Sequence, residues 1–141
     1  MSSDTAIAAG RQAAEAEMTL TLTAYEPNGI TKGPDGLDVL AFTPRGQVFG
    51  KVQGGSSSAR DSQDRYIRIG DVERPVLAGG LHIPISATVP TAGEQRGTGW
   101  EYVVTAVGAL DDIALLGKRF LVVNVPIKSK ATARRLDVIE L

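Results

Sequence analysis

Few residues in this 141-residue chain can do acid–base or metal chemistry, because it holds one histidine and no cysteine. His82 lies in the apolar stretch LHIPI (81–85). A general base normally needs an orienting partner and a pocket, so we interpret His82 as a strand residue. The lack of cysteine excludes disulfides and thiolate metal sites, and a single histidine excludes multi-histidine centres. We therefore expect no catalytic, cofactor-binding or metal-binding residues.

Two adjacent carboxylates, Asp111 and Asp112, resemble an acid–base pair, but they precede the short segment IALLG (113–117). Carboxylates in that position commonly cap a helical turn, because they accept hydrogen bonds from free N–H groups. We expect one short helical turn here, ended by Gly117. The glycine-rich pieces GKVQGGS (50–56) and RGTGW (96–100) precede no amphipathic helix that could present its N-terminus to phosphate, and they are interpreted as turns. With no catalytic motif elsewhere, we expect a protein that is not an enzyme.

One long helix is predicted at residues 4–18, which are rich in alanine and follow good N-cap residue types. One face of this helix is expected to make its contacts, and that face holds few apolar side chains: Ile7, Arg11, Ala14 and Met18. Such a helix is marginal alone, so it needs the body of the protein or another subunit to lie against. Gly10 costs about 1 kcal/mol relative to alanine and fits a kink or a close packing contact. We predict that Ile7, Arg11 and Met18 contact a subunit or partner.

After residue 18 the sequence changes to short strand-like segments separated by glycine and proline. Several alternate between apolar and polar residues, as in TLTLTA (19–24) and WEYVV (100–104). Strands are predicted at 19–25, 38–42, 47–53, 65–69, within 76–89, and at 100–107, 119–125 and 134–141. This pattern predicts a mainly β fold, a small antiparallel β-barrel or sandwich of residues 19–141, with an N-terminal α-helix at 1–18.

Three stretches are predicted to be loops. Residues 27–36 and 91–99 are rich in glycine and contain proline or small polar residues, which suits hairpin connections. Residues 54–64 (GGSSSARDSQD) contain no large apolar side chain. Because such a segment cannot bury itself, we expect a long flexible loop there.

The charge is balanced overall and uneven locally. A net charge of −1 gives no whole-chain reason to bind nucleic acid or an anionic membrane. Residues 118–135 nevertheless hold six basic residues and no acidic one, whereas residues 1–40 hold six acidic and two basic residues. This asymmetry fits a solvated face, or a surface that meets the acidic part of another copy or partner. For the second case the predicted contact residues are Lys118, Arg119, Arg134 and Arg135.

Four stretches together resemble a known family: GRQAAEAEM (10–18), LHIPIS (81–86), WEYVVTAV (100–107) and the end of the chain from residue 111. The most specific piece is D-x-x-L-L-G-[KR]-x-F-x-V followed by S-x-x-T-A-R-R-L. Its positions are Asp112, Leu115, Leu116, Gly117, Lys118, Phe120 and Val122, then Ser129, Thr132, Ala133, Arg134, Arg135 and Leu136. The chain resembles the small head-to-tail connector or stopper proteins in the neck of siphophage-type tailed phages of actinobacteria. Phe49 and Gly50 are the nearest match to an aromatic–glycine element of that family, and the loop after Gln53 departs from its pattern.

The resemblance implies a structural role in the virion neck, with the host cytoplasm as the place of assembly. It implies a homo-oligomeric ring of six small β-barrels, with the adaptor ring above and the tail terminator or tail tube below. Such a ring joins the tail to the filled capsid and retains the packaged DNA. Genomic double-stranded DNA passes through the bore without sequence specificity, and no membrane partner is implied.

The resemblance also suggests a place for the loop at 54–64. In a ring it would project into the bore, where Lys51, Arg60 and Arg65 would lie near DNA phosphates. The same loop could instead be a solvent hairpin or a docking loop for the adaptor.

Two alternatives stay open from the sequence. A tail terminator or tail-completion protein would sit one layer lower, although terminators tend to have longer helices over a sheet. A nucleic-acid-binding barrel of the OB type would use the basic segment 118–135, with Trp100, Tyr102 or Phe120 as stacking groups.

Overall fold

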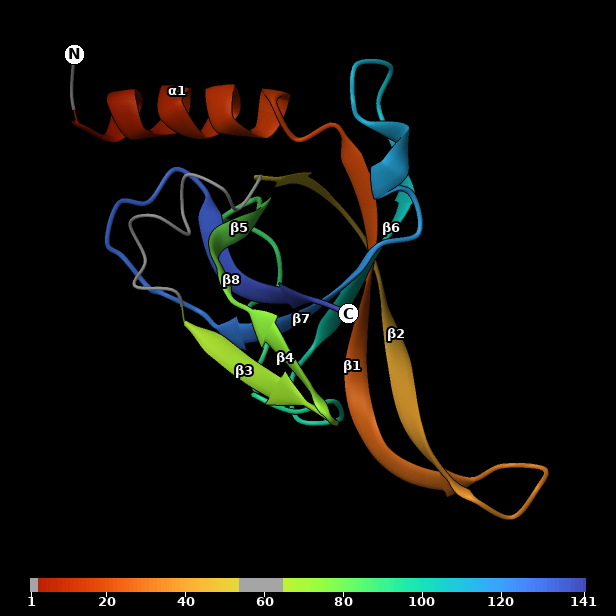
Figure 1. The fold of residues 1–141 in the computed structure, drawn as a ribbon. Coiled ribbons are helices and arrows are strands. Elements are labelled where there is room, and N and C mark those ends of the chain that lie inside the picture. Colours follow the sequence, from red (N-terminus) through yellow and green to blue (C-terminus); the bar gives the residue numbers. More distant parts are fainter. Residues whose placement is uncertain (1–2, 54–64) are drawn as a thin grey trace.

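The computed structural model describes residues 3–53 and 65–141, and its architecture is mainly β, as predicted (Figure 1). One α-helix, α1 (Ser3–Ala16), precedes the strands, and one 3₁₀ turn, η1 (Ile113–Leu115), lies between β6 and β7. The strands are β1 (Leu20–Lys32), β2 (Asp38–Val52), β3 (Tyr66–Ile69), β4 (Val72–Pro75), β5 (Leu77–Ile83), β6 (Glu101–Ala106), β7 (Arg119–Asn124) and β8 (Arg134–Glu140). The predicted loop at 54–64 falls outside the described residues.

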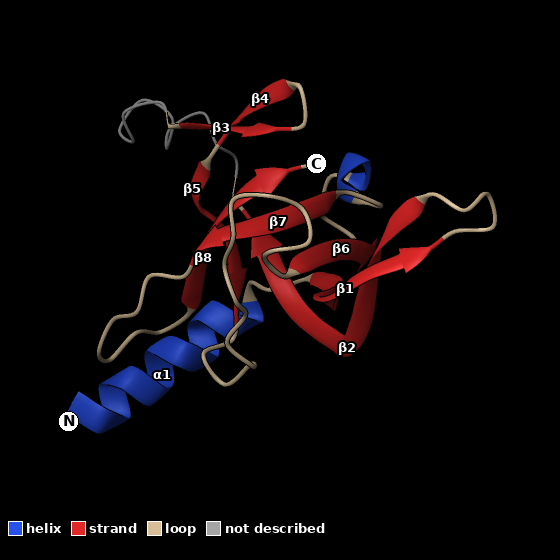
Figure 2. Cartoon of the chain, turned by 90° about the horizontal axis from the view of Figure 1, so that it is seen from below, coloured by secondary structure: helices blue, strands red, loops and turns tan. Residues whose placement is uncertain are grey.

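Six strands form a closed ring in the order β1-β2-β5-β8-β7-β6, and every neighbouring pair is antiparallel. We refer to this ring as the barrel. The remaining strands, β3 and β4, form a separate two-stranded hairpin. Figure 1 and Figure 2 show α1 and the tip of the β1–β2 hairpin projecting on opposite sides of the barrel.

The interior of the barrel follows the alternation in the sequence. Leu20, Leu22 and Ala24 of β1 point inward, and the threonines between them are half-buried. The core is completed by Leu81, Ile83, Trp100, Tyr102, Val104, Phe120, Val122, Leu136 and Val138. Gly50 is required where β2 passes this core, because a Cβ there would lie 2.5 Å from Leu22 Cδ1 and 2.9 Å from the His82 carbonyl oxygen.

A second apolar cluster lies outside the barrel wall, beneath the β3–β4 hairpin. Its members are Ile67, Val76, Leu121, Val123 and Ile139. The two faces of β7 are therefore both buried, which explains the continuous apolar run of this strand.

The β1–β2 hairpin differs from the prediction of a loop at residues 27–36. Strand pairing continues to the Lys32 and Asp38 pair, across an irregularity between Pro27 and Ile30. The turn occupies only residues 33–37, where the Gly33 N–H donates to the Leu37 carbonyl at 2.8 Å. Strand β2 is also continuous, whereas two separate strands at 38–42 and 47–53 were expected.

Elsewhere the predicted elements are mostly confirmed. Residues 91–99 form a loop, and η1 is the expected helical turn, with Asp112 accepting a hydrogen bond from the Ala114 N–H at 2.9 Å. The run 76–89 contributes only β5, and β4 was missed by the sequence analysis. The fold thus presents two projections, α1 and the β1–β2 hairpin, on a small barrel.

Candidate functional site

The basic segment 118–135 divides into a paired part and an unpaired part. Lys118 forms an ion pair with Glu140, and Arg119 forms one with Glu101. Their charges are thus neutralised within the chain, and their predicted contact with a subunit or partner stays a prediction. Within residues 3–53 and 65–141, none of the other four cations of the segment has an ion-pair partner: Lys128, Lys130, Arg134 and Arg135.

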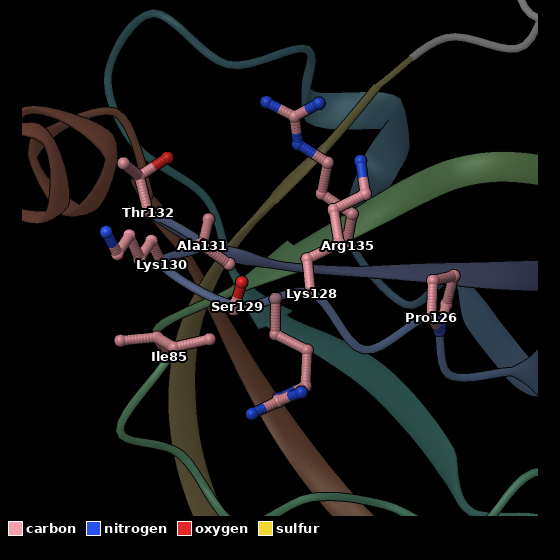
Figure 3. A pocket seen from close by; sticks show the side chains of 10 residues that line it. Ile85, Pro126, Lys128, Ser129, Lys130, Ala131, Thr132 and Arg135 are labelled. Atoms are coloured by element: carbon pink, nitrogen blue, oxygen red, sulfur yellow. The ribbon is translucent and has the colours of Figure 1, made fainter. Parts of the chain in front are cut away.

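These four cations line one pocket of about 240 Å³ beside the open end of the barrel (Figure 3). The rest of its lining is Ile85, Pro126, Ser129, Ala131, Thr132 and Ala133. No acidic residue is among them, and Ser129 and Thr132 add hydroxyl groups. In Figure 3 the side chains of Lys128 and Arg135 extend toward the same side of the loop, and Lys130 extends away from them. We call this hollow the basic pocket.

Two elements position the basic pocket. Arg134 and Arg135 belong to β8, whose register pairs them with Ile83 and His82 of β5. Lys128 and Lys130 belong to the loop between β7 and β8, where Lys130 adopts a left-handed backbone with φ of 60°. The pocket therefore has one wall fixed by strand pairing and another formed by a loop.

Helix α1 holds that loop in place. The Arg11 Nε donates a hydrogen bond to the Ala131 carbonyl oxygen at 3.1 Å. Gly10 makes a close packing contact with Thr132, which was one of the two roles expected for it. A Cβ at residue 10 would lie 2.8 Å from Thr132 Cγ2. The stripe predicted at Ile7, Arg11 and Ala14 is the half-buried face of the helix. Arg11 thus contacts its own chain.

The Arg134 guanidinium has an unusual environment. Its Nε is buried and has no hydrogen-bond partner in the described part of the chain. Burial raises the pKa of the Tyr102 hydroxyl, and the positive charge of Arg134 lowers it by a smaller amount. The Arg74 Nε is in the same state, and a buried charged donor without an acceptor costs about 1–3 kcal/mol or more.

His82 borders a neighbouring pocket together with Lys51, Glu17 and Arg135. Burial lowers the pKa of its imidazole, and the positive charges of Arg135 and Lys51 lower it further, against opposing effects of the Gly79 carbonyl and Glu17. The neutral ring donates from Nε2 to the Gly79 carbonyl at 2.9 Å. His82 is a strand residue with one satisfied nitrogen, as interpreted from the sequence.

A family model described as a family of unknown function (DUF6093) matches residues 10–139. The chain belongs to this family. The DUF6093 match runs from the Gly10 contact on α1 to β8, and it includes the lining of the basic pocket. Searches of curated proteins and of solved structures gave no match.

Two of the three residues predicted to face DNA form ion pairs within this DUF6093 chain. Lys51 bonds to Glu17 at 3.0 Å, and Arg65 bonds to Glu94 at 3.0 Å. Arg60 lies outside the described residues. Both ion pairs are exposed, and the role of Lys51 and Arg65 as phosphate contacts stays a prediction.

Two further predictions are corrected by burial. Met18 was expected to contact a subunit or partner, but its side chain is buried within the chain. The three aromatic residues offered as stacking groups, Trp100, Tyr102 and Phe120, are at most 6% exposed and belong to the core. They are not available to stack on bases, which removes the main support for an OB-type barrel.

The sequence analysis missed Glu101, the one charged residue buried in the described part of the DUF6093 chain. Its carboxylate accepts hydrogen bonds from the Arg96 Nη2 at 2.9 Å and from the Arg119 Nε. Both guanidinium groups also lie over the Phe42 ring, at 5.6 and 5.1 Å from its centroid. A glutamate in an apolar strand, with an arginine on the next strand, was the available signal for this cluster.

Over residues 3–53 and 65–141, no group of three or more histidine, aspartate or glutamate side chains could hold a metal ion. In the same residues no helix is both long and apolar enough to cross a bilayer. The candidate functional features are the basic pocket and two groups of exposed apolar side chains, one at the tip of the β1–β2 hairpin and one around η1.

Proposed function

We propose that this chain is a structural subunit, and not an enzyme, of the head-to-tail junction of a tailed phage, namely a stopper ring. In this proposal six copies form a ring between the adaptor and the tail, join the tail to the filled capsid, and retain the packaged DNA. The resemblance of residues 112–136 to neck proteins supports the proposal, and so does a small barrel with two projections.

The observation that carries the proposal is the pair of exposed apolar groups at opposite ends of β1. At one end, the tip of the β1–β2 hairpin exposes Ile30, Leu37 and Val39. At the other end, the segment around η1 exposes Leu110, Ile113 and Leu116. A subunit with two different apolar contact surfaces at opposite ends binds the next copy head to tail. Such contacts form a closed ring when the rotation from one copy to the next adds up to a full turn.

The residues that carry the resemblance hold the second apolar group in place. Asp111 accepts hydrogen bonds from the Thr19 hydroxyl at 2.6 Å and from the Gly108 N–H at 2.7 Å, which fixes the η1 segment to the start of β1. Leu115 packs against the barrel core, and Gly117 has a φ of 85° that favours glycine. These contacts hold the segment that exposes Leu110, Ile113 and Leu116 against the start of β1.

A genetic experiment tests the joining role. Deleting the gene for this chain should give DNA-filled heads and free tails that do not join, and supplying the chain in trans should restore tailed particles. Normal joining without the chain would refute the proposal. Tails of uncontrolled length would instead indicate the tail terminator, one layer lower.

A further inference from the structure

We propose that the basic pocket is a binding site for a phosphate group, held between the β7–β8 loop and β8. The proposal does not depend on the phage role, because it rests only on the charges and geometry of this pocket.

The charge of the pocket is uncompensated. Lys128, Lys130, Arg134 and Arg135 line it, no carboxylate does, and within the described residues none of the four has an ion-pair partner. Of the ten other lysines and arginines in the described residues, seven form ion pairs, including Lys118 and Arg119 of the same segment. The like charges of Lys128 and Arg135, which extend toward the same side in Figure 3, repel each other, and an anion relieves that repulsion.

The donor types favour phosphate over a single carboxylate. Arginine guanidinium groups and lysine ammonium groups are the usual partners of phosphate oxygens, and the Ser129 and Thr132 hydroxyls can donate as well. A phosphate monoester carries a charge of about −1.5 to −2 near neutral pH, which matches this cationic surplus better than one carboxylate.

The pocket is formed before any ligand arrives. Strand pairing fixes Arg134 and Arg135, and the Arg11 bond to Ala131 together with the contact between Gly10 and Thr132 fixes the loop. A preformed site spends less binding free energy on ordering its own side chains and backbone. The two sources of the group are a free phosphate compound and the backbone of a nucleic acid.

Calorimetric titration of the full chain tests the proposal, in a phosphate-free buffer at low and at moderate salt. The probes are inorganic phosphate, a short DNA duplex of arbitrary sequence, and poly-glutamate. Arg135→Gln and Lys128→Gln should each weaken phosphate or duplex binding about tenfold. The matched control, Arg68→Gln, removes an exposed arginine of β3 outside the pocket and should leave binding within about twofold.

Each outcome decides the matter. Binding of both phosphate probes supports a site for the group itself, and binding of the duplex alone, lost in Arg135→Gln, assigns the group to a nucleic-acid backbone. Binding of neither probe, equal weakening by Arg68→Gln, or tighter binding of poly-glutamate than of either phosphate probe overturns the proposal. Circular dichroism of each variant confirms that it is folded. A lack of phosphate binding would leave the ring proposal standing, because that proposal rests on the exposed apolar groups at the hairpin tip and around η1.

Discussion

Gly10 of α1 lies so close to Thr132 that a Cβ atom at residue 10 would come to 2.8 Å from Thr132 Cγ2. The two residues join the N-terminal helix to the loop that carries Lys128 and Lys130. A helix with few apolar side chains is thus held by one close contact and by the Arg11 hydrogen bond to Ala131. Its position depends on the absence of a side chain at residue 10.

Gly10→Ala should therefore fail to give the helix the stability that alanine normally brings. The expected gain of about 1 kcal/mol in an exposed helix is offset by the contact with Thr132. Thr132→Ser removes the obstructing methyl group, so Gly10→Ala should be more stabilising in that background, by roughly 1 kcal/mol. Thermal unfolding of the four chains, followed by helix ellipticity, measures this coupling. Additive effects of the two substitutions would contradict the packing described here.

Arg119→Met should destabilise the fold by about 2–3 kcal/mol. This change removes a charged hydrogen-bond donor from the fully buried Glu101 carboxylate and leaves Arg96 as its remaining partner. The matched control is Arg45→Met, because Arg45 pairs with Glu26 at the surface and such pairs contribute about 1 kcal/mol or less. Urea unfolding gives both values. An equal loss in the two variants would show that Glu101 is not dependent on Arg119.

The single histidine provides a pH-dependent test. The pKa of His82 should lie below its ordinary value of 6.5 in the native state, because burial and the charges of Arg135 and Lys51 disfavour the imidazolium. As the pH falls below about 6.5 the unfolded chain takes up a proton before the native chain does, so native stability is lost in that range. Above about pH 6.5 the contribution of His82 to the free energy of unfolding is constant. His82→Gln should remove this part of the pH dependence of the free energy of unfolding.

Arg135→Gln should raise the pKa of His82, and Arg68→Gln should not, since Arg135 is the charge that lowers the pKa of the ring most. NMR titration of the one imidazole follows this directly. A native pKa at or above 6.5 in the unchanged protein would contradict the environment described.

Substitutions in the two exposed apolar groups, at the hairpin tip and around η1, should impair assembly and leave folding nearly unchanged. Leu37→Ser on the hairpin tip and Leu110→Ser near η1 replace exposed side chains, so each should change unfolding free energy by about 0.5 kcal/mol or less. Both should reduce the fraction of tailed particles in a complementation assay. Val72→Ser, at an exposed position of β4, is the matched control and should complement fully. Full complementation by Leu37→Ser and Leu110→Ser would argue against ring contacts at these ends.

The strands of the barrel could be predicted because their side chains alternate locally. Leu20, Leu22 and Ala24 point inward as the period of two requires, and Asp112 caps η1 because a carboxylate there has a local N–H to accept from. Such features depend on neighbours within a few residues.

The features that were missed depend on the turns and on the closed fold. Pro27, Asn28 and Gly29 suggested a turn, yet the strand passes through them as an irregularity and turns at Gly33–Leu37. The Gly70–Asp71 turn that creates β4 was overlooked beside the clearer β3 pattern.

The paired and unpaired cations could not be told apart from the sequence. Lys118 and Arg119 resemble Arg134 and Arg135 in type and in segment. The pairing of β7 with β6 and with β8 brings Glu101 to Arg119 and Glu140 to Lys118. The sequence therefore predicted the basic segment, and the fold divides it and locates the basic pocket.

The central claim is that this chain forms a ring in the neck of a tailed phage, and a cryo-electron microscopy map of purified particles tests it most directly. We expect six copies of the barrel between the adaptor and the tail. The hairpin tip with Leu37 should lie in one interface of each copy, and Leu110 near η1 should lie in another. A neck that contains no density for this barrel, or a chain found outside the particle, would contradict the account.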